Sequence, residues 1–220
     1  MWIKKSKLTY VITEVIIVAI GVLFAFFISN TSIKIKEHKQ EKTIILDLLG
    51  DIEYNIEQSD MALKDANKYY EICNATIELL KTNTFSIDSL PYKLPALTYE
   101  IMTQIKATTY ESIKSTGEFN LIKDKEIRSL IIEYYIFSLD VRRIESVFSQ
   151  FSNDSKSYIN KNIDVKNIHN HPKEILNSKE FFNRFHSAMN YSGSRVYYYN
   201  TFLDESISIK EKLSLYYDSL

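Results

Sequence analysis

Apolar residues follow the 3-4 spacing of an amphipathic helix over most of the chain. Four segments carry this pattern, at about residues 32–82, 96–116, 124–162 and 178–218. The first is the longest and is interrupted only by Gly50, which costs about 1 kcal/mol against alanine inside a helix. No segment shows the two-residue alternation of a half-buried strand. The pattern therefore predicts an all-α protein, an antiparallel bundle of about four long helices.

Each predicted helix has a set of residues that the spacing places on one face, where we expect the core. In the first helix these are Ile45, Leu49, Ile52, Ile56, Ser59, Leu63, Ala66, Tyr70, Cys73, Ile77 and Leu80. In the second they are Ile101, Ile105, Thr108 and Ser112. In the third they are Ile127, Leu130, Tyr134, Phe137, Val141, Ile144, Phe148, Phe151, Ser155 and Tyr158. In the fourth they are Phe182, Phe185, Met189, Val196, Tyr199, Leu203 and Ile207.

The ends of these helices are marked by residues suited to caps and turns. Gly117 follows the second helix and can take the left-handed conformation that often ends a helix. Asp124 precedes the third helix and is expected to cap its first turn. Asn177, with Glu180 three residues later, has the spacing of a capping box at the start of the fourth. The predicted boundaries rest on these signals.

The segment from Leu8 to Ile28 is almost wholly apolar, and residues 15–28 contain no polar side chain. At about 1.5 Å per residue its length is roughly 31 Å, which matches the hydrocarbon core of a bilayer. A basic tail, residues 1–7, precedes the segment, and no small-residue cleavage site follows it, so we predict an uncleaved membrane anchor. No glycine or proline interrupts residues 29–40, so this transmembrane helix should continue into the bundle domain, residues 29–220.

Three residues of the anchor stand out from its apolar surroundings. Gly21 and Ala25 form a small-xxx-small pair, which lets two membrane helices approach closely. Glu14 is an ionisable residue inside an apolar segment, and such residues are a default hypothesis for function. Either Glu14 lies close enough to the lysine-bearing end to reach headgroups or water, or it takes part in helix–helix contact or proton handling. The sequence leaves both alternatives open.

Composition and motifs argue against several functional classes. The net charge of −1 over 220 residues provides no basic surface for nucleic acid. The single cysteine, Cys73, cannot form an internal disulfide and occupies a predicted core position. His169 and His171 lie in a polar loop without the further ligands or spacing of a metal site. No P-loop, GxSxG, GxGxxG or HExxH motif occurs, so we predict no cofactor, no metal and no enzymatic activity.

Two sequence segments carry a family resemblance. The first is EVIIVAIGVLFA at residues 14–25, followed by Asn30. The second is TYESIKSTGEFNLI at residues 109–122, followed by EYY at residues 133–135. In this order they resemble a family of small bacterial membrane proteins known only as a domain of unknown function, although the tryptophan expected after Asn30 is missing here. The resemblance implies a membrane-bound helical protein and no particular activity.

Lysines flank the anchor on both sides, so the positive-inside rule is close to balanced. They are Lys4, Lys5 and Lys7 before the anchor and Lys34, Lys36, Lys39 and Lys42 after it. A short basic tail stays inside easily, and a long following domain can cross the membrane largely regardless of its charge. We expect a single pass through a bacterial inner membrane, with the N-terminus in the cytoplasm and the bundle in the periplasm.

Three functional hypotheses follow. The first is a membrane-anchored bundle that binds a protein partner or itself, as a scaffold or a sensor. The second is a subunit of an oligomeric channel or ion-coupled complex, in which Glu14 of one anchor faces other anchors. The third is a small-ligand sensor with its site between the second and third helices, around Tyr110 and the Gly117 turn.

Overall fold

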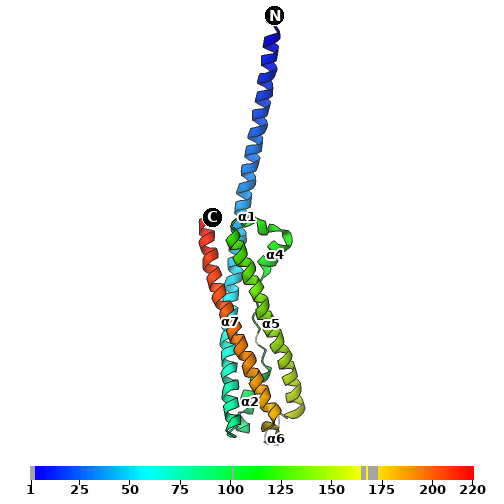
Figure 1. The fold of residues 1–220 in the computed structure, drawn as a ribbon, viewed down its shortest axis with the longest axis vertical. Coiled ribbons are helices and arrows are strands. Elements are labelled where there is room, and N and C mark those ends of the chain that lie inside the picture. Colours follow the sequence, from blue (N-terminus) through cyan, green and yellow to red (C-terminus); the bar gives the residue numbers. More distant parts are fainter. Residues whose placement is uncertain (1–2, 101, 165–166, 168–172) are drawn as a thin grey trace.

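Three long helices dominate the computed structural model (Figure 1). The structure describes residues 3–100, 102–164, 167 and 173–220. The long helices are α1 (Ile3–Lys81), α5 (Lys125–Asn162) and α7 (Lys179–Ser219). The shorter elements are η1 (Ile87–Ser89), α2 (Leu90–Lys93), α3 (Pro95–Thr98), α4 (Thr108–Thr116), η2 (Glu118–Leu121) and α6 (Lys173–Leu176). Every regular element among the described residues is helical, which confirms the all-α prediction.

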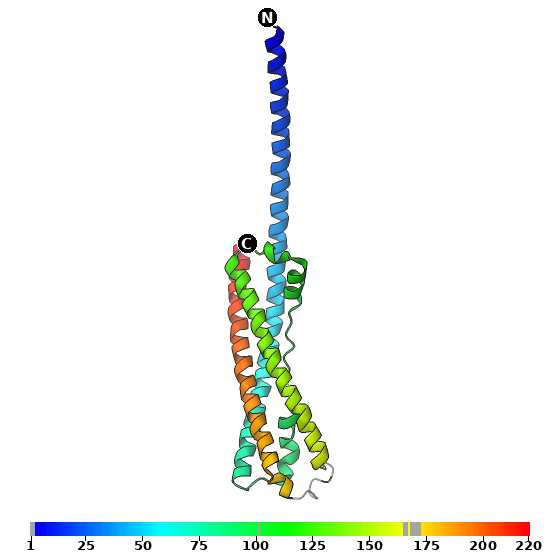
Figure 2. The ribbon, with the colours of Figure 1, turned by 45° about the vertical axis from the view of Figure 1, so that its right-hand side comes forward.

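The chain passes along the bundle four times (Figures 1 and 2). α1 runs from the N-terminus to the far end, where α2 and α3 lie, and an irregular segment then returns to α4 beside the middle of α1. α5 runs parallel to α1, and α7 runs back antiparallel to both and packs along each of them. Consecutive passes are therefore antiparallel, as predicted, but the second pass is not a long helix.

α1 joins the predicted anchor to the bundle without a break. Its N-terminal part projects from the bundle as a bare helix, and every side chain from Tyr10 to Lys36 is exposed (Figure 2). Within it lies an apolar stretch that is long enough to cross a membrane and is not covered by the rest of the chain. The predicted anchor and first helix are thus one continuous element of 79 residues.

The prediction of a helix over residues 96–116 is wrong in its middle. Only Pro95–Thr98 and Thr108–Thr116 are helical, and Met102–Ala107 is non-helical chain that spans the gap between them. We call Met102–Ala107 the strap. Side chains of α1 and α5 bind its main-chain groups and so replace the hydrogen bonds that a helix would have supplied.

The predicted core faces were partly wrong as well. Ile101 lies outside the described residues, and Thr108 and Ser112 are exposed. In α7 the buried positions include Phe181, Ala188, Ser192, Arg195, Phe202 and Ser206, whereas Phe182, Met189, Val196, Leu203 and Ile207 lie at the edge or in solvent. The centre of this face holds small or polar residues, which an apolar pattern does not count. The predicted core face of α7 is therefore rotated to one side of the observed one.

The helix caps follow local sequence more closely. The Asp124 carboxylate accepts hydrogen bonds from the amides of Glu126 and Ile127, as expected for the N-cap of α5. Gly117 ends α4 with a φ of 76°, in the left-handed conformation. The N-cap of α7 is Ser178 rather than the predicted Asn177, because the Ser178 hydroxyl accepts from the Phe181 amide.

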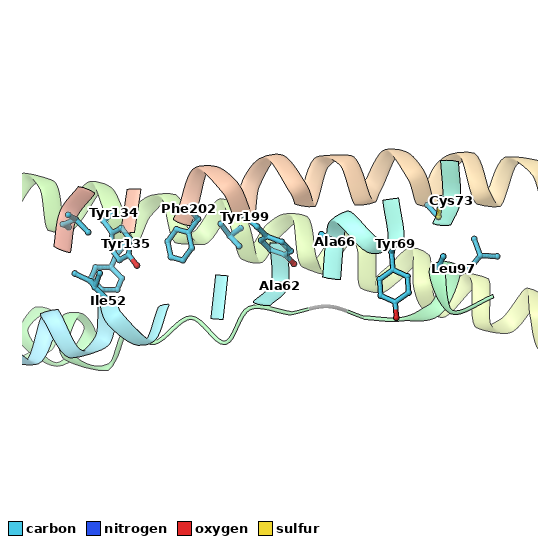
Figure 3. Close-up of a cluster of buried hydrophobic side chains, with 14 of the residues drawn as sticks. Ile52, Ala62, Ala66, Tyr69, Cys73, Leu97, Tyr134, Tyr135, Tyr199 and Phe202 are labelled. Carbon is cyan, nitrogen blue, oxygen red and sulfur yellow. The ribbon is translucent and has the colours of Figure 1, made fainter. Parts of the chain in front are cut away.

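The core lies between the three long helices. Figure 3 shows Tyr134, Tyr135, Tyr199 and Phe202 lined along it, with the returning chain running beside them. Tyr134 stacks on Phe202 at a ring distance of 5.1 Å and meets Tyr135 edge-on at 4.9 Å. Aromatic packing of this kind joins α5 to α7, and the returning chain adds Tyr99 against Tyr69 of α1 and Tyr110 against Tyr135.

Candidate functional site

Three carboxylates and one amide of the long helices are almost fully buried. Glu41 and Asp51 are each 2% exposed, Asn55 is 0% exposed, and Glu145 of α5 is 3% exposed. A buried polar group is costly unless it has a hydrogen-bond partner. All four find partners in main-chain or hydroxyl groups of the chain that returns between α1 and α5. We take this set as the candidate functional site.

Asn55 binds one residue of the strap through both ends of its amide. Its Oδ1 accepts from the Lys106 main-chain amide at 2.6 Å, and its Nδ2 donates to the Lys106 carbonyl at 3.0 Å. The same Nδ2 lies 3.1 Å from the hydroxyl of Tyr134, which in turn shares a 2.9 Å hydrogen bond with Ser206. Asn55 therefore connects α1, the strap, α5 and α7 through one network.

Asp51 lies one helical turn before Asn55 and binds the end of the strap. Its Oδ2 accepts from the amide of Thr109 at 2.8 Å, in the first turn of α4. Its Oδ1 pairs with the ammonium group of Lys106 at 2.9 Å. A carboxylate at the N-terminal end of a helix satisfies amides that have no partner within the helix. Asp51 thus anchors both the strap and the start of α4.

Glu145 holds the strap from the side of α5. Its Oε1 accepts from the Thr103 amide at 2.5 Å, from the Thr103 hydroxyl at 2.7 Å and from the Tyr199 hydroxyl at 3.0 Å. Burial, and after it the charge of Glu145, raises the pKa of Tyr199, so this phenol stays protonated and can donate. One carboxylate oxygen therefore joins the strap, α5 and α7.

Arg195 is the other charged residue in this part of the core. It is 0% exposed, and its guanidinium carbon lies 3.6 Å from the centre of the Phe148 ring. Its Nη2 donates to Ser192 at 3.1 Å, while Nε and Nη1 have no hydrogen-bond partner among the described residues. Burial lowers the pKa of Arg195, and the nearby charge of Glu145 opposes that shift.

Polar side chains of α5 also hold the outer edge of the returning chain. Arg142 donates from Nη2 to the carbonyl of Ile105 at 3.2 Å, and Ser152 donates to the carbonyl of Thr98 at 2.8 Å. Glu100 pairs with Lys156 at 2.6 Å, and this hydrogen bond is the main reason that the pKa of Glu100 is lowered. The returning chain is therefore bound along its length by side chains.

Glu41 makes a similar contact nearer the anchor. Its Oε1 accepts from the Lys123 amide at 2.6 Å and from the Tyr216 hydroxyl at 2.5 Å. Burial, followed by the hydrogen bond to Glu41, raises the pKa of Tyr216 to about 12. This carboxylate links α1 to the start of α5 and to the last turns of α7, and so closes the end of the bundle that faces the anchor.

Sequence reasoning missed these residues, although a signal was present. Asp51 and Asn55 lie at a spacing of four, next to the apolar positions Leu48 and Ile52, and Glu145 lies between Val141 and Phe148. Charged or amide residues at core spacing indicate a partner that lacks hydrogen bonds of its own. The partner could not be named, because the bonds go mainly to main-chain groups.

The residues predicted as sites lie far apart along the molecule. Glu14, Gly21 and Ala25 are exposed on the bare part of α1, and a Cβ at Gly21 would meet no atom within 4 Å. Tyr110 is 9% exposed and stacks on Tyr135 at 4.4 Å, and Gly117 supplies only the turn after α4. The face of Tyr110 that a ligand would need is therefore covered by Tyr135.

The cysteine and histidine residues were the other candidates for chemistry. Cys73 is 0% exposed, and burial raises the pKa of its thiol to about 12. His169 and His171 lie outside the described residues, and the described residues hold no group of three or more His, Cys, Asp or Glu side chains able to bind a metal ion. The Cys73 thiol therefore behaves as a small core side chain rather than as a nucleophile at neutral pH.

Two surface grooves lie near the anchor. One, of about 500 Å³, runs between α1 and α4 and includes Lys36, Lys39 and Ser112. The other, of about 730 Å³, runs between α5 and α7 and includes Leu130 and Lys212. Both are open, and acidic side chains line each of them beside the lysines.

Comparison with known proteins adds no family to this description. No protein-family model, no curated protein and no solved structure matches the chain.

Proposed function

We propose that this chain is a non-catalytic, membrane-tethered bundle that associates with a second copy of itself along α1 and acts as a scaffold or a sensor. The anchor passes once through a bacterial inner membrane, with the N-terminus in the cytoplasm and the bundle in the periplasm. The resemblance to single-pass bacterial membrane proteins supports a membrane anchor, as does the apolar stretch of α1 that the rest of the chain leaves uncovered. The proposed orientation rests on the short basic tail that precedes the anchor.

One observation carries the proposal: a single face of α1 runs from the anchor to the outside of the bundle. Glu14 and Gly50 are 36 residues apart, which is about ten turns of an α-helix, so they lie on the same face. Gly21, Ala25 and Leu46 fall on that face as well. In the bundle this face points away from the core, because Leu46 is 53% exposed and Gly50 is exposed.

The chemistry of this face suits close approach of an identical helix. Gly21 and Ala25 let two membrane helices come together, and a Cβ at Gly50 would likewise meet no atom within 4 Å. No contact within one copy therefore requires glycine at position 50, where it weakens the helix by about 1 kcal/mol. Association along this face also brings the Glu14 side chains of the two copies together and takes them out of contact with lipid.

The test uses two identical substitutions on different faces. Ala25→Ile adds bulk to the proposed face, whereas Ala19→Ile adds the same bulk about 120° away around the helix. We expect Ala25→Ile to lower the dimer fraction of the full-length protein in lipid nanodiscs and Ala19→Ile to leave it unchanged. Equal effects, or a strictly monomeric parent protein, would refute self-association along this face.

Cysteine cross-linking gives a second reading of the same contact. Ser32→Cys lies on the proposed face, and Lys34→Cys lies about 200° away from it. The native Cys73 is buried and should not compete. Oxidation in membranes should cross-link Ser32→Cys strongly and Lys34→Cys weakly, and the reverse ranking would overturn the proposed face.

A channel or ion-coupled subunit is the second candidate function, and the position of Glu14 supports it. Glu14 shares its face with Gly21 and Ala25, so association along that face would bring the carboxyl groups together. Proton or cation flux into vesicles that Glu14→Gln abolishes, with cross-linking unchanged, would favour this function over a scaffold. No flux from the parent protein would exclude it.

The side of the membrane needs its own experiment. A phosphatase that is active only outside the cytoplasm, fused after Leu220, should be active if the bundle is periplasmic. The same fusion on a chain in which Lys4, Lys5 and Lys7 are all replaced by Gln tests whether the basic tail sets the orientation. An inactive fusion on the parent chain would reverse the proposed topology.

A further inference from the structure

The strap has a sequence that favours a helix. Its residues are Met102, Thr103, Gln104, Ile105, Lys106 and Ala107, and most of these are good helix formers. No proline or glycine occurs between Pro95 and Gly117, so nothing in the local sequence prevents one helix from running through it into α4. The non-helical conformation therefore has to come from contacts outside the segment.

Those contacts are the side chains described above. The amides of Thr103 and Lys106 donate to Glu145 and Asn55, and the carbonyls of Ile105 and Lys106 accept from Arg142 and Asn55. Within the strap, as the structure describes it, one local main-chain hydrogen bond joins the Ile105 amide to the Thr103 carbonyl at 3.0 Å. The conformation is thus held from both sides, by α1 and by α5.

We propose that the strap is a two-state element: held extended while Asn55 and Glu145 bind it, it winds into a helix continuous with α4 when they release it. Six fully extended residues would shorten by about 11 Å on passing from a rise of about 3.3 Å to a helical rise of 1.5 Å each, and the local turn from Thr103 to Ile105 makes this an upper limit for the strap. Since α3 packs on α5 and α7 and α4 packs on α1, one of these short helices must then move along the bundle.

This movement reaches the membrane through α1, a step that rests on the proposed function. α4 lies beside the part of α1 that leads into the anchor, and the groove between them includes Lys39 and Thr43. Thr43 borders the face proposed for self-association, so a shift of α4 changes what a second copy meets there. The strap then couples the state of the bundle to the pairing of the anchors.

The experiment measures the length of the strap in the full-length protein in nanodiscs. Spin labels at Met102→Cys and Ser115→Cys, both exposed positions, report the distance across it. Asn55→Ala removes both hydrogen bonds to Lys106, and Asn67→Ala is the matched control, because Asn67 bonds only to Leu63 in its own helix. Asn55→Ala should add a population shorter by up to about 11 Å, and Asn67→Ala should not.

Proline separates winding from simple loosening. The Gln104 amide donates to no described residue, so Gln104→Pro is compatible with the extended strap but not with a helix. Added to Asn55→Ala it should abolish the shorter population, whereas Gln104→Ala should retain it. A broad distribution without a shorter peak, or a shorter peak that survives Gln104→Pro, would overturn the two-state strap.

Hydrogen exchange keeps the proposal testable if Asn55→Ala weakens the whole bundle. We expect exchange at the Lys106 amide to accelerate about tenfold or more while the amides of α7 keep their protection. Equal acceleration across α7 would refute a local release. Cross-linking through Ser32→Cys on the same samples tests the proposed function separately. If cross-linking persists while the strap stays extended, the two-state strap is refuted and self-association is retained. If the parent protein without the Asn55 substitution does not cross-link, self-association alone is refuted.

Discussion

Two segments run back along α1, and they are held in opposite ways. α7 makes its main-chain hydrogen bonds internally and presents side chains such as Phe185 and Phe202 to the core, both 0% exposed. The strap makes few such bonds and presents main-chain groups instead, which Asn55 and Glu145 satisfy. The first is held mainly by the burial of apolar area and the second mainly by directional polar contacts.

The difference explains the mixed composition of the core. α1 and α5 bear mainly apolar residues where they face α7 and buried polar residues where they bind the strap, and two of the buried carboxylates, Glu41 and Glu145, also bind hydroxyl groups of α7. Apolar side chains in a core can be exchanged or repacked at modest cost if the total volume is conserved. A peptide group that is bound at both its N–H and its C=O instead fixes the position and register of the segment. The strap is therefore the more specific of the two contacts and the less stable one.

The largest expected effect is on the α7 side. Phe202→Ala removes a fully buried ring that stacks on Tyr134, and we expect a loss of about 4 kcal/mol in the free energy of unfolding. Tyr197→Ala on the same helix is the control, since Tyr197 is 65% exposed and should change stability by less than about 0.5 kcal/mol. Denaturant unfolding of the full-length protein in detergent measures both. A small effect of Phe202→Ala would remove the contrast between the two segments.

The second effect is on the strap side. Glu145→Ala leaves the Thr103 amide and the Tyr199 hydroxyl without their acceptor and leaves the Arg195 charge without its neighbour. We expect a loss of about 3 kcal/mol, together with faster exchange at Thr103 than anywhere in α7. Glu133→Ala, at an exposed position of the same helix, is the control. Uniform loss of protection would show that the strap is not a separate unit.

The contrast also shows what the sequence can and cannot predict. Helical periodicity, caps and the apolar run are local, so α5, the Asp124 cap and the continuity of α1 with the anchor could be predicted. The strap could not, because its conformation depends on Asn55 and Glu145, which are about 50 and 40 residues away in the chain. The burial of Arg195 and Ser206 could not be predicted for a related reason, because apolar periodicity does not count polar residues at the centre of a buried face.

Stability at alkaline pH should report first on the core beside α7 and then on the contact with the strap. Burial raises the pKa of Cys73 from an ordinary value of 9.0 to about 12 and that of Tyr134 from 10.0 to about 12. Both groups bind protons more tightly in the folded state, so their contribution is complete below the unfolded pKa and is lost as pH rises towards the folded one. We expect Cys73 to remove up to about 1.4 kcal/mol of stability per pH unit above pH 9, and Tyr134 to do the same above pH 10.

Variants assign this pH dependence to the two groups. Cys73 lies near Arg195 of α7, so Cys73→Ser should flatten the profile from pH 9. Tyr134 binds Asn55, so Tyr134→Phe should reduce the slope only above pH 10, where Tyr216 and Tyr199 also contribute to it. Thermal unfolding between pH 8 and pH 11 gives both slopes. A profile that Cys73→Ser leaves unchanged would show that the thiol is not kept neutral by the fold.

The smallest effects come from two glycines, one at the end of α4 and the other on the outer face of α1. Gly117 has a φ of 76°, so Gly117→Ala should lower the free energy of unfolding by about 1 kcal/mol. Gly50 is helical and has open space around it, so Gly50→Ala should raise it by up to about 1 kcal/mol in a monomer. If copies pair along this face, the added methyl group should instead lower the dimer fraction in nanodiscs. A bundle that is more stable and still pairs normally would restrict the contact to the anchor, where Gly21 and Ala25 lie.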